Sequence, residues 1–264
     1  RDSGLCIALD QKMRNFAENY LMTARDYAEM GAYEEAAALL ERCTEEQPML
    51  YYYRAYYQQK IDGTSEAGTV TTENIILYEK TIKLLECAEN CPSDYCFPNK
   101  LEDIAVLDFA IQNGCRKKAP YYLGNLYYDK LQWEKAVRLW EMSAAAEPDF
   151  AIVHRNLALA YYNKCKDAVR AQESMEKAFA LNPGDTRIFL ELDQLYKKLG
   201  RTFDQRLQNC EAHSELLRDR DDLYIEYITL LNLTGHYQKA CDCMMEHHFH
   251  AWEGGEGKIT TQYK

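Results

Sequence analysis

The stretch Ala119–Asp149, APYYLGNLYYDKLQWEKAVRLWEMSAAAEPD, predicts two antiparallel helices joined by a short turn. Small residues occur where the helices would touch: Gly124 on the first helix, Ala136 and Ser143 on the second. Large apolar residues fill the positions between them, namely Leu123, Tyr127, Trp133 and Trp140. Pro148 ends the second helix, because proline cannot continue one. A helical pair of this kind cannot bury its apolar face alone, so the stretch predicts neighbouring units.

The same pattern recurs along the chain. Tyr27, Gly31, Tyr33, Ala36 and Pro48 fall in the register of Tyr127, Leu131, Trp133, Ala136 and Pro148. A pattern of small and large residues that repeats every 34 to 35 positions is typical of tetratricopeptide repeats. The sequence therefore predicts an all-α fold, a tetratricopeptide-type α-solenoid in which helical hairpins form a right-handed superhelix. We expect the small residues to lie at helix crossings: Gly124, Ala136, Ala158, Ala171, Ala178 and Ala240.

We expect a single solenoid over residues 1–264. Its units are predicted at about 15–48, 49–90 (irregular), 100–116 (one extra helix), 117–149, 150–184, 185–220 and 221–248, followed by a Gly-rich tail at 249–264. The chain begins at Arg1 and stops within a repeating pattern at Lys264, which is typical of a fragment of a longer protein.

Composition narrows the class of partner. Lys and Arg total 31 against 42 Asp and Glu, giving a net charge of −11, and this argues against nucleic acid, whose phosphates need clustered positive charge. No apolar run is long enough to span a membrane. The ten cysteines include no CxxC pair, and Cys43 and Cys165 occupy positions where a repeat wants a small buried residue. These features favour reduced thiols and a cytoplasmic location.

No arrangement of catalytic residues is evident, and we expect no enzyme activity, cofactor or metal in this chain. The string GGEGKIT lacks a P-loop, because Trp252 stands where the first glycine belongs and Ile259 follows the lysine. Cys243 and His247 share a helical face, but Cys241 points elsewhere. Cys87, Cys91 and Cys96 lack a fourth ligand for zinc.

The inner surface of the first helices is the candidate binding site. In such solenoids these helices line the concave side, and positions that packing leaves free can contact a ligand. Tyr and Arg are common in binding surfaces. The predicted groove consists of Tyr121, Asn125, Tyr128, Asp129, Arg155, Tyr162, Asn163, Arg187, Gln194 and Lys197. The alternative is a solvent-filled groove that binds no ligand.

The tail carries a second candidate site. Phe249 and Trp252 have apolar surface to bury, and the glycines that follow allow a tight turn. We expect an ordered loop that contacts another domain, formed by His250, Trp252, Glu253, Gly254, Gly255 and Glu256. A plain connector is the alternative.

Four strings resemble a known family: PYYLGNLYYDK (120–130), RNLALAYYNK (155–164), LDQLYKKLGR (192–201) and FHAWEGGEGK (249–258). They are similar to the helical C-terminal part of large bacterial proteins with an upstream sugar-epimerase-like β domain of unassigned function. The resemblance implies tetratricopeptide repeats and a carbohydrate context. The peptide clamp of chaperone-binding tetratricopeptide domains fits less well, because Asn125 matches its Asn but Tyr121 replaces its Lys.

These observations predict a non-catalytic binding or scaffolding module of a larger, carbohydrate-related bacterial protein. Its partner is expected to be a protein, another domain of the same polypeptide or a carbohydrate, and not nucleic acid or membrane. Two alternatives remain: a helical part that completes the active site of an upstream carbohydrate-active domain, and a free-standing adaptor between proteins.

Overall fold

The computed structural model describes residues 13–62, 72–250 and 257–262. The chain divides into two compact units, Arg1–Pro148 and Asp149–Lys264. The division follows Pro148, the residue at which the sequence pattern places the end of a repeat. Each unit is described by itself.

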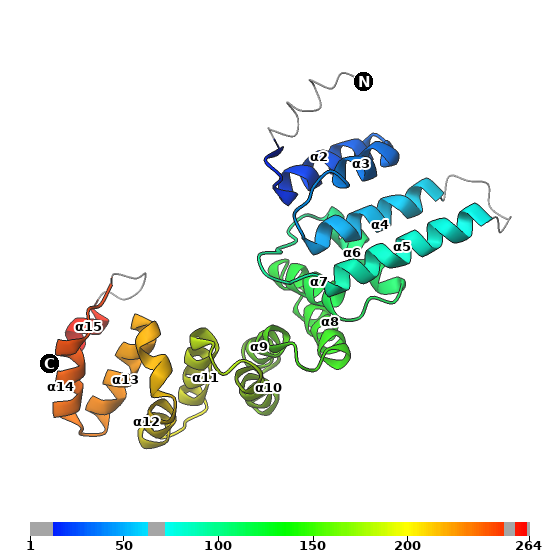
Figure 1. Cartoon of the computed structure of the whole chain (residues 1–264). Coiled ribbons are helices and arrows are strands. Elements are labelled where there is room, and N and C mark those ends of the chain that lie inside the picture. The colour runs from blue at the N-terminus through cyan, green and yellow to red at the C-terminus, as the bar shows by residue number, and fades with distance from the viewer. Residues whose placement is uncertain (1–12, 63–71, 251–256, 263–264) are drawn as a thin grey trace. The chain divides into compact units, whose positions relative to one another are not determined.

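The described residues of the first unit form three helical hairpins and one additional helix (Figure 1). Helix α2 packs on α3, α4 on α5, and α7 on α8, whereas α6 lies against α4 and α7. The helices are α2 (Ala17–Glu29), α3 (Tyr33–Leu40), α4 (Pro48–Asp62), α5 (Thr72–Asn90), α6 (Glu102–Gln112), α7 (Lys118–Asp129) and α8 (Trp133–Ala146).

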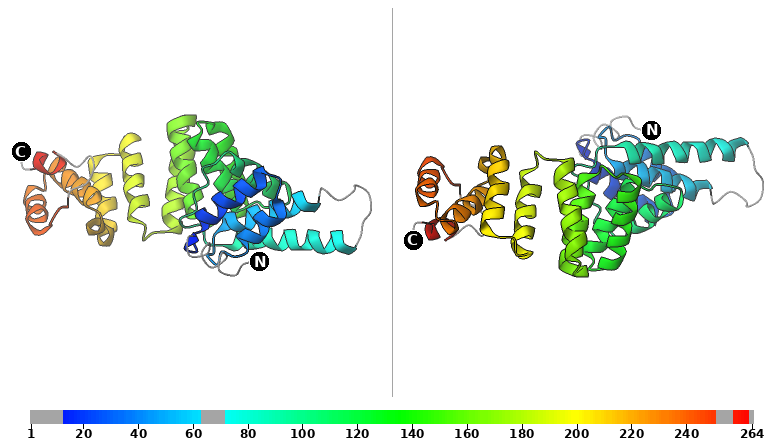
Figure 2. Two further views of the ribbon diagram at one scale, coloured as in Figure 1. Left: turned by 90° about the horizontal axis from the view of Figure 1, so that it is seen from above. Right: turned by 90° about the horizontal axis from the view of Figure 1, so that it is seen from below.

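The second unit repeats the hairpin arrangement, and Figure 2 shows its helices side by side in two further views. Its elements are α9 (Ala151–Ala160), a π-helical turn (Tyr161–Cys165), α10 (Ala168–Leu181), α11 (Thr186–Lys198), α12 (Phe203–Ala212), a 3₁₀ turn (Ser214–Asp219), α13 (Asp221–Leu233), α14 (Tyr237–Glu246) and α15 (Lys258–Thr261). The described residues contain helices and no strand, which confirms the all-α, tetratricopeptide-type hairpin fold.

The small residues predicted at helix crossings are buried, as such positions require. The five predicted alanines are at most 2% exposed. At Gly124 an added Cβ would lie 2.5 Å from Trp140 Nε1 and 3.2 Å from the Ala136 carbonyl oxygen. The glycine thus allows α7 to approach α8 closely.

The turns between paired helices use one backbone motif. In the turn after α7, the Gln132 N–H donates to the Tyr127 carbonyl and the Leu131 N–H to the Tyr128 carbonyl. This pair of bonds is a Schellman motif, whose C′ residue adopts a left-handed conformation. Residues with positive φ occupy that position after the first helix of each regular hairpin: Gly31, Leu131, Lys166, Gly200 and Gly235.

The unit at 150–184 contains one departure from this motif. The Asp167 N–H donates to the Tyr161 carbonyl, because a π-helical turn accommodates an extra residue before the turn. Cys165 lies in that turn and is exposed, so the expectation that it is a small buried residue is wrong. Cys43 is half-buried, and the cysteines in the described ranges are free thiols.

Glu89 holds the start of the hairpin formed by α7 and α8. It lies on α5, and its carboxylate accepts hydrogen bonds from the backbone N–H groups of residues 116 to 119 at distances of 2.8–3.1 Å. The Tyr52 hydroxyl donates a further bond of 2.6 Å. A carboxylate satisfies the open N–H groups at a helix N-terminus and interacts favourably with the helix dipole. Glu89 therefore connects α4, α5 and α7.

Candidate functional site

The predicted groove residues fall in both units. Four of them lie on α7 or at its end, namely Tyr121, Asn125, Tyr128 and Asp129. The other six belong to the second unit, on α9, its π-helical turn and α11: Arg155, Tyr162, Asn163, Arg187, Gln194 and Lys197.

On α7, most of the predicted positions serve the packing of Trp140. The buried indole N–H of Trp140 donates to the Asn125 side chain at 3.0 Å and to the Tyr121 carbonyl at 3.2 Å. The Tyr128 ring lies 5.3 Å from the Trp140 ring. A buried Trp needs a partner for its N–H, and the first helix of the hairpin supplies it.

The expectation that packing leaves Tyr121 free is corrected by its burial. Its side chain is buried, and its ring contacts that of Tyr122 at 5.2 Å. Asp129 is exposed and forms an ion pair with Lys130 at 2.9 Å. On this part of the predicted surface, Asp129 is thus the most accessible of the four side chains.

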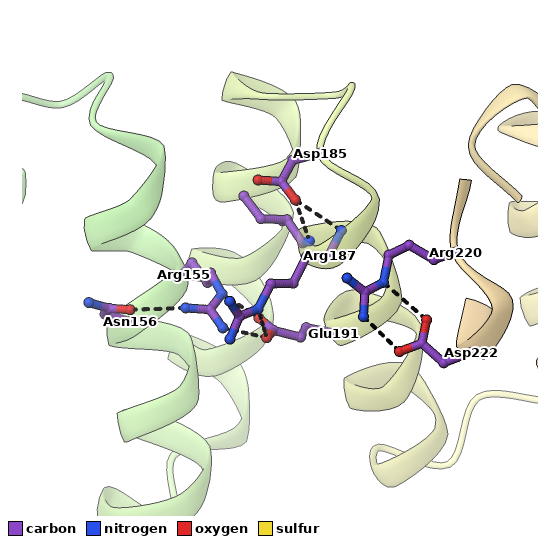
Figure 3. A network of polar contacts seen from close by, with 8 residues as sticks. Arg155, Asn156, Asp185, Arg187, Glu191, Arg220 and Asp222 are labelled. Atoms are coloured by element: carbon purple, nitrogen blue, oxygen red, sulfur yellow. Dashed lines mark hydrogen bonds and ion pairs between the residues drawn. The ribbon is translucent and has the colours of Figure 1, made fainter. Parts of the chain in front are cut away.

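In the second unit, two arginines converge on one carboxylate. Figure 3 shows Arg155 on α9 pointing to Glu191 on α11, where its Nε and Nη2 donate to both carboxylate oxygens. The Nε of Arg187, one turn earlier on α11, donates to Glu191 Oε1 at 3.4 Å. Paired bonds between a guanidinium and a carboxylate are strong and fix the orientation of both groups. Arg155 and Glu191 are mostly buried, whereas the Arg187 side chain is 66% exposed.

A second arginine pair lies beside this cluster (Figure 3). Arg220 donates to both oxygens of Asp222, at 3.0 and 2.7 Å. The hydrogen bonds to Asp222 raise the pKa of Arg220 against the effect of burial, and the charges of Glu191 and Asp185 add to this increase. The three arginines and their carboxylates come from α9, α11 and the start of α13, which are first helices of their hairpins.

Sequence reasoning missed the carboxylates of this cluster. Asp185 accepts bonds from the N–H groups of Arg187 and Ile188 and therefore caps α11. Its position just before the helix was a usable signal. The pairing of Arg155 with Glu191, 36 residues apart, carries no local signal.

The remaining predicted residues have different surroundings. Lys197 donates to Glu226 at 2.9 Å, and Glu226 also accepts from Arg206 at 2.7 Å. Burial would raise the pKa of Glu226, but the hydrogen bonds from Lys197 and Arg206 outweigh it and lower that pKa. Tyr162 is half-buried with the Lys198 ammonium 5.3 Å from its ring centre. Asn163 and Gln194 are exposed.

The beginning of the tail attaches to α13. The His247 ring lies 2.6 Å from Asp221 Oδ1, and the His250 N–H donates to Asp221 Oδ2 at 2.7 Å. The rings of His247 and Phe249 pack at 4.6 Å, and that of His247 lies 4.5 Å from Tyr224. The other residues of the predicted docking loop, Trp252, Glu253, Gly254, Gly255 and Glu256, lie outside the described residues.

Within the described ranges, no group of three or more His, Cys, Asp or Glu side chains could hold a metal ion. Among the helices in those ranges, none has both the length and the apolar character needed to cross a membrane.

No protein-family model matches the chain. Solved structures that resemble it include MamA (41 to the end) from Desulfovibrio magneticus RS-1, with 19% identity and a TM-score of 0.42 over 78% of this chain and 97% of that one. A thermophilic TPR protein of Thermus thermophilus has 19% identity and a TM-score of 0.42 over 82% and 99%. PilF of Pseudomonas aeruginosa has 14% identity and a TM-score of 0.44 over 87% and 89%. At such low identities and TM-scores, these likenesses carry no argument about ligand or activity.

Proposed function

We propose that the chain is a non-catalytic binding and scaffolding module, and that the first helices of its second unit hold an acidic segment of a protein partner. The observation that carries this proposal is the convergence of Arg155 and Arg187 on the single carboxylate of Glu191. Arg155 occupies both oxygens of Glu191 and Arg220 occupies both oxygens of Asp222, so the exposed guanidinium of Arg187 is the group of this cluster that is open to a partner. A carboxylate from a partner would form an ion pair with the Arg187 guanidinium.

Arg187 is the residue best suited to contact the partner. A guanidinium carries five N–H donors, and Arg187 uses one of them on Glu191. Its exposure leaves the side chain accessible, and the planar group matches a carboxylate in two-point contact. Arg155 is mostly buried, so its role is to hold Glu191 and the arrangement around it. Asn163 and Gln194 supply exposed polar groups at the end of α9 and on α11.

The wider context comes from the sequence resemblance. Proteins with a similar helical part carry an upstream sugar-epimerase-like β domain, and we place this module in such a carbohydrate-related bacterial protein of the cytoplasm. The partner is then a protein or another domain of the same polypeptide. His250, which is held on Asp221, is the described end of the loop proposed to dock on that domain.

The proposal is tested by selecting peptides from a random displayed library on the wild-type chain. We expect the enriched peptides to be rich in Asp and Glu. Their affinity should fall at least about tenfold, or 1.4 kcal/mol, for Arg187→Glu, because the substitution replaces an attractive charge with a repulsive one. Arg138→Glu is the matched control. Arg138 is 72% exposed and lies on α8, the second helix of its hairpin, in the first unit.

Equal affinity of the acidic peptides for wild type and Arg187→Glu would reject the surface as the binding site. Enriched peptides without an acidic bias would reject the proposed partner chemistry.

A further inference from the structure

The loop between α5 and α6 displays large apolar side chains to solvent. Tyr95 is 90% exposed, Phe97 is 73% exposed and Leu101 is 67% exposed. We call the segment that carries these three side chains, residues 95–101, the aromatic loop. Exposed apolar residues that occur singly are common, but a group of them within one short segment is typical of an interaction site.

Buried groups hold this loop in place from beneath. Cys96, between the two exposed aromatic residues, is 1% exposed. Asp103, also 1% exposed, accepts from the backbone N–H groups of Asn99 and Lys100, each at 2.9 Å. The Tyr53 hydroxyl donates to the same carboxylate at 2.6 Å, and Arg25 pairs with it at 3.4 Å. A charge is costly to bury unless it is paired and hydrogen-bonded, so this network gives the loop one preferred conformation.

Tyr95 also has an unusual backbone. Its φ is 55°, in the left-handed region that non-glycine residues rarely adopt. Residues held in this region cost on the order of 1 kcal/mol or more, and they occur often at functional sites. The strained residue and the buried network together hold the backbone of this segment in place before any partner binds, which reduces the backbone entropy lost on binding.

The second unit contains a cavity that would accept such side chains. It has a volume of about 540 Å³ and lies between α13, α14 and α15. Its wall includes apolar side chains on α13 and α14, with polar groups from α13 and α15 beside them: Leu233, Tyr237, Met244, Thr229, Asn232 and Gln262. Leu233 and Tyr237 are exposed, so apolar surface reaches solvent at this position.

We propose that this chain self-associates head to tail, with the aromatic loop of one copy seated in the cavity between α13, α14 and α15 of a second copy. The chain carries both complementary surfaces, an apolar protrusion and an apolar cavity of sufficient volume. Charges near them also match. Asp94, Lys100 and Glu102 are exposed in or beside the aromatic loop with a net negative charge, and the exposed Lys258 begins α15, which forms one wall of the cavity.

The geometry of such a contact determines the assembly. The two surfaces are different parts of the same chain, so each copy can bind one partner through its loop and another through its cavity. A contact of this heterologous kind forms rings if it closes and open chains of copies if it does not.

The size of the contact predicts weak association. Three side chains of this kind remove on the order of 500 Å² from solvent on one copy, and about 1,000 Å² in total. Interfaces of that size belong to transient complexes. We therefore expect association that grows with concentration and does not saturate at a dimer.

The test uses sedimentation velocity on the 264-residue chain from about 10 μM to about 1 mM. The wild-type weight-average mass should rise with concentration. A loop variant (Tyr95→Asn with Phe97→Ser) and a cavity variant (Leu233→Glu) should each remain monomeric, because all three residues are exposed and their substitution leaves the core intact. Val169→Ser is the control, since Val169 is equally apolar, is 67% exposed and belongs to neither surface.

Mixing the two variants gives the decisive result. The intact loop of the cavity variant can enter the intact cavity of the loop variant, so the mixture should form a complex of two chains and no larger species. A wild type that stays monomeric throughout the range would overturn the proposal. So would a mixture that stays monomeric while the wild type associates, because the interface would then not pair these two surfaces.

Discussion

At the scale of single residues, the turn between α7 and α8 contains backbone strain that a substitution could remove. Leu131 has a φ of 62° at the position that Gly31, Gly200 and Gly235 occupy in other hairpins. A left-handed conformation costs a side-chain-bearing residue roughly 1–2 kcal/mol, whereas glycine adopts it freely. Leu131 is 69% exposed, so its removal loses little burial.

We therefore expect Leu131→Gly to raise the free energy of unfolding by about 0.5–1 kcal/mol, after the greater chain entropy of glycine is subtracted. The reverse change, Gly200→Ala, should lower it by about 1 kcal/mol. Chemical denaturation measures both. A clear loss of stability in Leu131→Gly would show that the leucine side chain makes a contribution larger than the strain.

Gly124 is predicted to tolerate no side chain. Because an added Cβ would meet the Trp140 ring and the Ala136 carbonyl, Gly124→Ala should cost on the order of 1–3 kcal/mol by overpacking. Ala136→Leu should cost a similar amount at the same crossing. Gly184→Ala is the control, since no atom lies within 4 Å of its added Cβ. Equal melting temperatures for the three variants and the wild type would contradict the close contact of α7 and α8.

At the scale of helices, α7 depends on a carboxylate from another hairpin. Glu89→Ala removes the acceptor of four backbone N–H groups at the α7 N-terminus. Hydrogen bonds to a charged group are worth about 1.5–3 kcal/mol, so we expect a loss of about 2–3 kcal/mol. Glu86→Ala, one helical turn earlier on α5 and exposed, should change stability by less than about 0.5 kcal/mol. Similar effects of the two substitutions would argue against the capping role.

The attachment of the tail to α13 should depend on pH and weaken as the pH falls. Burial would raise the pKa of Asp221, but hydrogen bonds from His247 and from the N–H and ring of His250 outweigh it and lower that pKa. A carboxyl group with a lowered folded-state pKa stabilises the fold above its unfolded-state pKa of about 3.9, and this contribution is lost as the pH falls through the folded-state value.

The difference in melting temperature between wild type and Asp221→Asn should therefore shrink as the pH falls from about 5 to about 3. Comparison of the two proteins removes the contributions of the other carboxylates, which titrate in both. A difference that stays constant over this range would show that the ionised carboxylate does not hold the tail.

At the scale of the whole molecule, the repeating features were accessible from sequence and the long-range pairs were not. Glycine readily adopts the left-handed conformation of these turns, as at Gly31, Gly200 and Gly235, and Gly124 and Ala136 marked a helix crossing, because each residue type has a local steric consequence. Leu131 adopts the same turn conformation without that signal. The long-range partners of Glu89 and Arg155 lie 27 to 37 residues away, so they depend on how hairpins stack. Tyr121 was misjudged because its position in the repeat does not by itself show that its side chain is buried.

We propose that the first helices of the second unit bind an acidic segment through Arg187, beside the Glu191 carboxylate that Arg155 holds in place. The most direct measurement is a nuclear magnetic resonance titration of the arginine Nε–H signals with an acidic peptide from the library selection. We expect the signals of Arg187 and Arg155 to shift together, because both guanidinium groups bond to Glu191, and to saturate at one peptide per chain, while that of Arg138 stays unchanged. Saturable peptide binding that leaves the signals of Arg187 and Arg155 in place would contradict it.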